Sequence, residues 1–180
     1  PCILYNANIA PLTPLAIKGF IWYQGEANTG RAEEYKSLFP AMITDWRKQF
    51  NEGDLPFLFV QLPNLGKDPL KPENSDWAEL REAQASALSL PNTGMAVTIN
   101  VGDADNLHPH NKLAVGNRLG ITALKVAYHV DSIETSPVYK NITVQNDSAL
   151  ITFTGNFICK DKYGYVRGFA ICGADSVFHW

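Results

Sequence analysis

Three short apolar runs alternate with amphipathic segments in the first 130 residues, and this alternation constrains the fold more than any other feature. The runs cover residues 16–23, 56–62 and 95–101, and they are rich in β-branched and aromatic side chains. Near-continuous apolar strands separated by helices are typical of a parallel sheet that is covered on both faces. The sequence therefore predicts an α/β fold with a parallel sheet.

The segment 31–50 shows the helical spacing of apolar residues most clearly. Its apolar side chains recur at i, i+3, i+4, i+7, i+8 and i+11, as on one face of a helix. Pro40 falls inside this pattern, and we expect it to kink the helix or mark a restart because proline has no N–H to donate. The apolar face consists of Tyr35, Leu38, Phe39, Met42, Ile43 and Trp46.

Two further helices are expected at residues 76–88 and 109–128. Asp76 is followed three residues later by Glu79, which predicts an N-cap at Asp76. Pro109 suits the first turn of the last helix, where a missing N–H costs nothing.

The pattern changes at about residue 131, after which no helical period remains. Short β-rich runs are separated by turn signals such as Asn-Asp and Gly-Asn, which predicts an all-β module that is unfinished at Trp180. The chain starts at Pro1 with no leader-like segment, so we expect it to be part of a longer polypeptide. The β-rich runs cover residues 142–144, 149–153, 168–172 and 177–180.

Composition argues against several classes of function. Lys and Arg total 15 against 18 Asp and Glu, a net charge of −3, so no basic surplus is available to hold nucleic acid or an anionic membrane. No apolar run approaches the ~20 residues of a membrane-spanning helix.

Cys2, Cys159 and Cys172 match no zinc-ligand spacing, and we expect unpaired cysteines rather than a bond between Cys159 and Cys172.

Polar clusters follow the first and the third apolar runs. Gln24, Gly25 and Glu26 follow the first, and Asp105 and His108 follow the third. Because ligands bind beyond the carboxyl ends of parallel strands, we expect both clusters at the same edge of the sheet.

The Asp105-x-x-His108 spacing allows two interpretations and a weaker third. The acid could accept the Nδ1–H of the imidazole and leave Nε2 as a general base. Alternatively, Asp105 forms a turn and His108 is a helix N-cap. A metal site that adds Asp103 and His110 is less favoured, because Pro109 keeps the two histidines off one helical face.

The first cluster could stabilise negative charge. The Gln24 amide or the Gly25 backbone N–H could donate to a developing oxyanion, an interaction worth roughly 3 kcal/mol. Glu26 could orient a base or bind a substrate hydroxyl, although a strand-ending turn with a solvated acid is the simpler interpretation.

The sequence shows no evident catalytic nucleophile. No serine has a G-x-S setting, only Ser75 lies in an evident loop of the α/β part, and Cys2 has no electropositive neighbour.

Several sequence blocks resemble the sialate O-acetylesterase family, which consists of SGNH-hydrolase-type carbohydrate esterases close to the acetylxylan esterases of carbohydrate esterase family 6. The blocks are IKGFIWYQGEANTGRAEEYKSLFPAMITDWR, PFLFVQLPN, WAELREAQ, LPNTGMAVTINVGDADNLHPHNK and VGNRLGITAL. The resemblance implies a flavodoxin-like three-layer α/β fold. Residues 1–130 would be the C-terminal part of the esterase domain, and residues 131–180 a β-rich, incomplete module.

The resemblance also implies hydrolysis of O-acetyl esters on sugars, with neither a metal nor an organic cofactor. His108 would be the general base and Asp105 its acid partner, with Glu26 as a rival for that role. Gln24, together with Gly25, would bind the oxyanion. The family's nucleophile lies in an upstream G-Q-S-N block that residues 1–180 lack, so we expect this segment alone to be inactive.

Three alternatives remain open at this point. The substrate could be acetylxylan or another acetylated glycan instead of an O-acetylated sialic acid. The chain could instead be a non-catalytic carbohydrate-binding or scaffold piece, or a metal-dependent deacetylase. We expect an acetylated sugar as the partner, self-association through an exposed sheet edge, and a periplasmic or secreted location that is inferred only from the substrate class.

Overall fold

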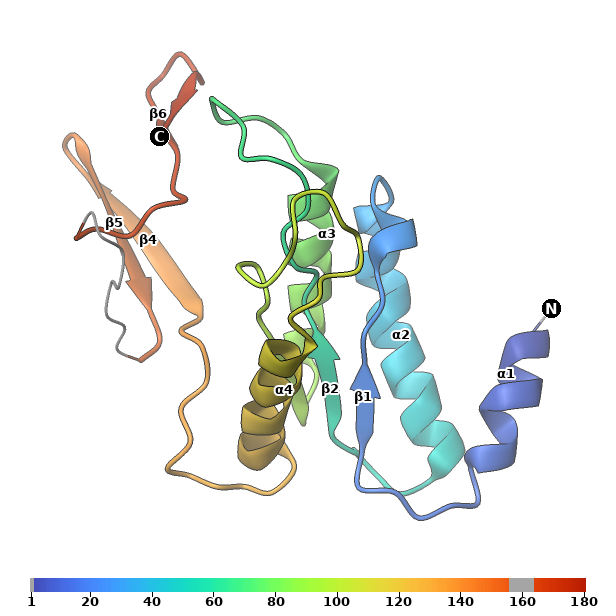
Figure 1. Cartoon of the computed structure of the whole chain (residues 1–180). Helices are drawn as coiled ribbons and strands as arrows, with labels where there is room; N and C mark the ends of the chain where they lie inside the picture. The colour runs from blue at the N-terminus through green and yellow to red at the C-terminus, as the bar shows by residue number, and fades with distance from the viewer. Residues whose placement is uncertain (1, 156–163) are drawn as a thin grey trace. The chain divides into compact units, whose positions relative to one another are not determined.

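A parallel sheet of three strands forms the centre of the larger of two structural units (Figure 1). The computed structural model describes residues 2–155 and 164–180. The strands are β1 (Phe20–Trp22), β2 (Phe57–Val60) and β3 (Thr93–Ala96), in that spatial order, and both neighbouring pairs are parallel. The predicted α/β fold with a parallel sheet is therefore confirmed.

Helices cover both faces of this sheet. Phe57 and Phe59 of β2 are fully buried in one apolar cluster with α2 (Ala32–Phe50) and α3 (Asp76–Ala85). Val60 clusters instead with Val115 of α4 (Lys112–Val126). Since alternate side chains of a strand point to opposite faces, α2 and α3 lie on one face and α4 on the other. The unit is thus a three-layer α/β/α structure, as the family resemblance implied.

Helix α2 continues through Pro40 without a break. The predicted restart at Pro40 is therefore wrong. The packing of the buried face of the helix, which includes Tyr35, Phe39 and Ile43, outweighs the one hydrogen bond that proline cannot make. The Phe39 ring meets the Phe59 ring edge-on at 5.1 Å between centroids, which ties the helix to the central strand.

Two predicted helix starts are shifted. Ser75, not Asp76, is the N-cap of α3, and its hydroxyl accepts a hydrogen bond from the Ala78 N–H at 3.3 Å. Asn111 caps α4 in the same way, so this helix begins after Pro109. In both cases the side chain that reaches the free N–H groups of the first turn decides where the helix begins.

The third strand is also displaced from its predicted position at 95–101. It spans Thr93–Ala96 because its pairing partner β2 ends at Val60, opposite Ala96. A turn follows, in which the Val101 N–H donates to the Thr98 carbonyl at 2.9 Å.

Short helical segments appear where the sequence predicted none, namely α1 (Ile3–Asn8) and the 3-10 turns at Ala10–Leu12 and Glu26–Asn28. The end of the helix predicted at 76–88 is a 3-10 turn, Ser86–Ser89. Within the described residues, the helices are all too short or too polar to cross a membrane.

The second unit comprises residues 68–74 and 134–180. Strands β4 (Tyr139–Gln145) and β5 (Ser148–Phe153) form an antiparallel hairpin, and β6 (Ile171–Cys172) pairs with β7 (Phe178–His179). β-structure therefore occurs in all four predicted runs, with different bounds. None of the residues described in this unit is buried. Cys172 is a free thiol, as is Cys2, whereas Cys159 lies outside the described residues.

Candidate active site

The two predicted polar clusters lie at the same edge of the sheet. β1 and β3 both run parallel to β2, so the loop 23–31 and the loop 97–111 leave the sheet at its carboxyl end. Tyr23, directly after β1, packs in one apolar cluster with Val101 and Val115. The Lys112 ammonium lies 4.9 Å from the centroid of the Tyr23 ring, a cation–π contact between the two segments. The expectation of a shared edge is confirmed.

The Gln24 side chain is held at both ends of its carboxamide. Its Nε2 donates to Oδ1 of Asn28 at 2.7 Å. Its Oε1 accepts from the Tyr35 hydroxyl at 3.3 Å, and the same hydroxyl lies 3.4 Å from the Gln24 carbonyl oxygen. Asn28 ends the turn after β1, and Tyr35 is a buried residue of α2. The bond to Asn28 uses one of the two N–H groups of Gln24 Nε2, so the second N–H can donate to another group.

Gln84 fixes the backbone beneath Gln24. It is fully buried on α3, and its Nε2 donates to the Gln24 carbonyl at 3.0 Å. Its Oε1 accepts from the Leu62 N–H at 2.9 Å. One side chain thus bridges the segments that follow β1 and β2, and the buried amide finds the partners that it needs.

Gly25 occupies a position that a side chain would not fit. Its φ of 155° is in the region that favours glycine, and an added Cβ would lie 3.0 Å from Gln84 Nε2 and 3.3 Å from Leu62 Cγ. Among the described residues, none accepts a hydrogen bond from the Gly25 N–H. Gly25 is buried, and its N–H is left as an unused donor beside the Gln24 carboxamide.

Glu26 places negative charge in the same cluster. It is partly buried at the start of the 3-10 turn. Burial raises the pKa of the Tyr23 phenol above its ordinary value, and the Glu26 charge raises this pKa further. Both effects keep the Tyr23 phenol protonated at neutral pH.

Asp105 and His108 lie exposed in the loop 97–111, and the structure does not join them. Across the described part of the chain, no hydrogen bond or ion pair links His108 to Asp105 or to Glu26. The His108 backbone N–H donates instead to Oδ1 of Asn106 at 2.9 Å. The alternative that His108 is a helix N-cap is wrong, since Asn111 caps α4.

The base of this loop is anchored to the loop after β2. The Gly102 N–H donates to Asn64 Oδ1 at 2.8 Å, and the Gly66 N–H donates to the Ala104 carbonyl at 3.0 Å. The His108 loop is therefore attached to the centre of the sheet through its neighbour.

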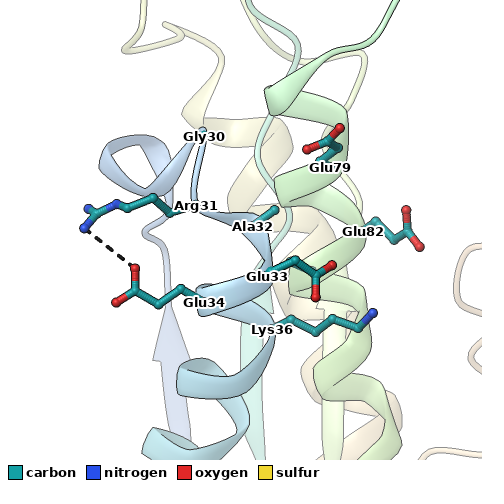
Figure 2. Close-up of a pocket in the computed structure, with 9 residues that line it drawn as sticks. Gly30, Arg31, Ala32, Glu33, Glu34, Lys36, Glu79 and Glu82 are labelled. Atoms are coloured by element: carbon teal, nitrogen blue, oxygen red, sulfur yellow. Dashed lines mark ion pairs between the residues drawn. The ribbon is translucent and has the colours of Figure 1, made fainter.

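Two surface grooves lie near the amino end of α2. One, of about 500 Å³, includes Trp22, Gln24, Asn28 and Tyr35 in its lining, so the Gln24 cluster borders an open space. The other lies between α2 and α3 and holds four glutamates with Arg31 and Lys36, and an ion pair of 3.8 Å joins Arg31 to Glu34 (Figure 2). It contains no predicted site residue.

A metal site and a nucleophile at Ser75 find little support among the described side chains. In the parts of the chain that are described, no three His, Cys, Asp or Glu side chains are grouped to hold a metal ion. Ser75, the one loop serine of the α/β part, serves as the cap of α3.

Two residues around Gln24, Tyr35 and Gln84, were not singled out as site residues from the sequence. Asn28 belongs to the polar segment that follows the first apolar run and meets Gln24 within one turn, whereas Tyr35 reaches it from α2. The sequence could have predicted a role for Gln84, because it is the polar residue on the helical face that also carries Leu80, Ala83 and Ala87.

Comparisons with known proteins identify the family of this chain. Residues 3–125 match the family described as carbohydrate esterase, sialic acid-specific acetylesterase. The chain is 34% identical to the sialate O-acetylesterase of Mus musculus over 173 residues and 35% identical to that of Homo sapiens over 145 residues. These matches cover 84% and 70% of this chain, but only 31% and 27% of the relatives.

A solved structure is also similar over nearly the whole chain. The crystal structure of a carbohydrate acetylesterase from Xanthomonas citri matches with 40% sequence identity and a TM-score of 0.86. The match covers 99% of this chain and 42% of that protein. By its sequence over residues 3–125 and by its fold, the chain belongs to the family of sialic acid-specific carbohydrate acetylesterases.

Proposed function

We propose that the protein is a carbohydrate O-acetylesterase and that residues 1–180 supply its general base and its oxyanion donors. The observation that carries the proposal is the Gln24 carboxamide, which Asn28 and Tyr35 hold at the sheet edge shared with the His108 loop. An amide donor in a fixed orientation is what a developing oxyanion requires. Membership of the acetylesterase family supports the same reaction.

The nucleophile is a serine outside residues 1–180. The relatives named sialate O-acetylesterase are much longer than this chain, which matches 31% of the mouse protein. The serine oxygen attacks the acetyl carbonyl while His108 takes its proton. The tetrahedral oxyanion accepts hydrogen bonds from Gln24 Nε2 and the Gly25 N–H.

Collapse of this intermediate completes the first half of the reaction. The bond to the sugar oxygen breaks, and His108 returns its proton to that oxygen, which leaves as a hydroxyl. Water, deprotonated by His108, then attacks the acetyl-enzyme and releases acetate and the free serine. Asp105 or Glu26 stabilises the protonated His108. The substrate that fits the family description is an O-acetylated sialic acid, with acetylated xylan as the rival.

A fluorophosphonate probe tests the reaction class. It should label one serine of the natural protein, peptide mapping should locate that serine outside residues 1–180, and His108→Ala should abolish the label. Acetate release from O-acetylated sialic acid and from acetylated xylan would then identify the sugar. A label on Ser75 would contradict the assignment of the nucleophile. No label and no acetate release from folded protein would favour a carbohydrate-binding role.

A further inference from the structure

The orientation of the Gln24 carboxamide matters for an oxyanion site. A glutamine side chain has a broad, roughly two-fold terminal torsion, so a free carboxamide would present its oxygen as readily as its N–H groups. An oxygen turned toward the oxyanion would repel it. An effective donor therefore requires neighbours that select one orientation.

Asn28 and Tyr35 are those neighbours. Asn28 Oδ1 accepts from Gln24 Nε2 at 2.7 Å, and the Tyr35 hydroxyl donates to Gln24 Oε1 at 3.3 Å. The first contact is with the nitrogen and the second with the oxygen, so together they distinguish the two ends of the amide. Tyr35 is only 5% exposed, and its position on α2 is fixed by packing.

The surroundings of Tyr35 keep its hydroxyl protonated. Burial raises the pKa of the Tyr35 phenol above its ordinary value, the neighbouring polar side chains of Trp22 and Gln84 oppose this rise, and the Glu26 charge adds to it. The phenol therefore remains a hydrogen-bond donor at neutral pH. Its hydrogen has the side-chain oxygen and the carbonyl oxygen of Gln24 within reach, at 3.3 and 3.4 Å.

We propose that Asn28 and Tyr35 are positioning residues, which hold the Gln24 carboxamide with the second N–H of Nε2 directed at the acetyl oxyanion. The inference rests on the proposed esterase function. Neither residue touches the substrate, and both act through Gln24. Their contribution should therefore depend on the presence of the Gln24 amide.

The test compares single and double variants of the natural protein in acetate release. Gln24→Ala should lower kcat about 100-fold or more, the usual effect of removing one oxyanion donor. Tyr35→Phe and Asn28→Ala should each lower kcat about 10-fold with little change in KM, because a displaced donor is lost mainly from the transition state. Asn28→Gln keeps an amide oxygen as acceptor without adding charge beside the oxyanion, and should recover part of the rate.

The decisive measurement adds Tyr35→Phe or Asn28→Ala to Gln24→Ala. A positioning role predicts no further loss of kcat, because the group being positioned is gone. Tyr128→Phe, an exposed tyrosine away from this cluster, is the matched control and should keep the full rate. Since Tyr35→Phe could destabilise the core, the partly exposed Asn28 gives the same test independently, with thermal unfolding as the check on folding.

Two results would overturn the inference in different ways. If Asn28→Ala and Tyr35→Phe reduce kcat equally with and without Gln24, or not at all, their role is structural while the esterase function stands. If the folded natural protein releases no acetate from any acetylated sugar, the proposed function fails and the inference falls with it.

Discussion

Gly102 and Asn64 approach so closely that a Cβ on Gly102 would lie 1.9 Å from the Asn64 carbonyl oxygen. The backbones of two neighbouring loops are in contact at this point, and one of these loops carries His108. The position of the proposed general base therefore depends on the absence of a side chain six residues earlier in the loop.

Gly102→Ala should displace the His108 loop. We expect a loss of about 1–3 kcal/mol in the free energy of unfolding, since a methyl group forced against backbone cannot be relieved by rotation. Urea unfolding measures this. Gly120→Ala is the matched control, because a Cβ there meets nothing within 4 Å and it lies within α4, where alanine is the better helix former. Equal stability of the two variants would show that the loops separate freely.

Gln84→Met should destabilise the protein by about 1–3 kcal/mol, because it leaves the buried Leu62 N–H without a partner and removes one of the two donors to the Gln24 carbonyl. The change preserves side-chain length, so little packing is lost. Chemical denaturation is the measurement, and Gln49→Met on the exposed side of α2 is the control. A Gln84→Met protein as stable as the control would mean that these polar groups find other partners.

Stability should fall at high pH in a way that depends on Tyr35. The folded state raises the pKa of this phenol above 10.0, so the folded protein holds the proton more tightly than the unfolded chain. This contribution is complete below pH 10.0 and is lost as the pH rises through the folded-state pKa. Tyr35→Phe should therefore flatten the decline in unfolding free energy above pH 10.0, whereas Tyr128→Phe should not. Identical declines in both variants would refute this explanation.

Neutralising the acid partner of His108 should cost about 1,000-fold or more in kcat. We expect Asp105→Asn to show this loss and Glu26→Gln a smaller one. Asp105 shares the loop of His108, three residues before it, whereas the Glu26 charge acts on Tyr23 and Tyr35. Kinetics of acetate release on the natural protein decide between them. A larger loss in Glu26→Gln would reverse the assignment.

Residues 1–180 produced alone should self-associate through β1. Among the residues that the structure describes, this strand pairs only with β2, and its central residue Ile21 is 70% exposed. An unpaired apolar edge is a template for another strand. Ile21→Lys should shift the sedimentation profile toward monomer, while Leu70→Lys, in an exposed loop, should not. A monomeric segment would contradict this expectation.

The boundaries of the elements show where sequence reasoning reaches its limit. The apolar run around β2 predicted a buried strand correctly, because burial on both faces leaves a local mark in the sequence. The predicted end of the third strand at residue 101 was wrong, because Ala96 is the last residue of β3 that pairs with β2. A strand ends where its neighbour ends, and that neighbour is distant in the chain.

The sequence by itself determined the parallel α/β sheet and the edge shared by the loops of Gln24 and His108, since apolar periodicity is a local property. The resemblance of its sequence blocks pointed to the esterase family. Only the tertiary structure decided the surroundings of Gln24. Asn28, Tyr35 and Gln84 meet it because a turn, a helix and a second helix converge at the ends of β1 and β2. It also left Asp105 and His108 unjoined. Hydrogen bonds between distant segments depend on side-chain geometry in three dimensions, and no local pattern encodes them.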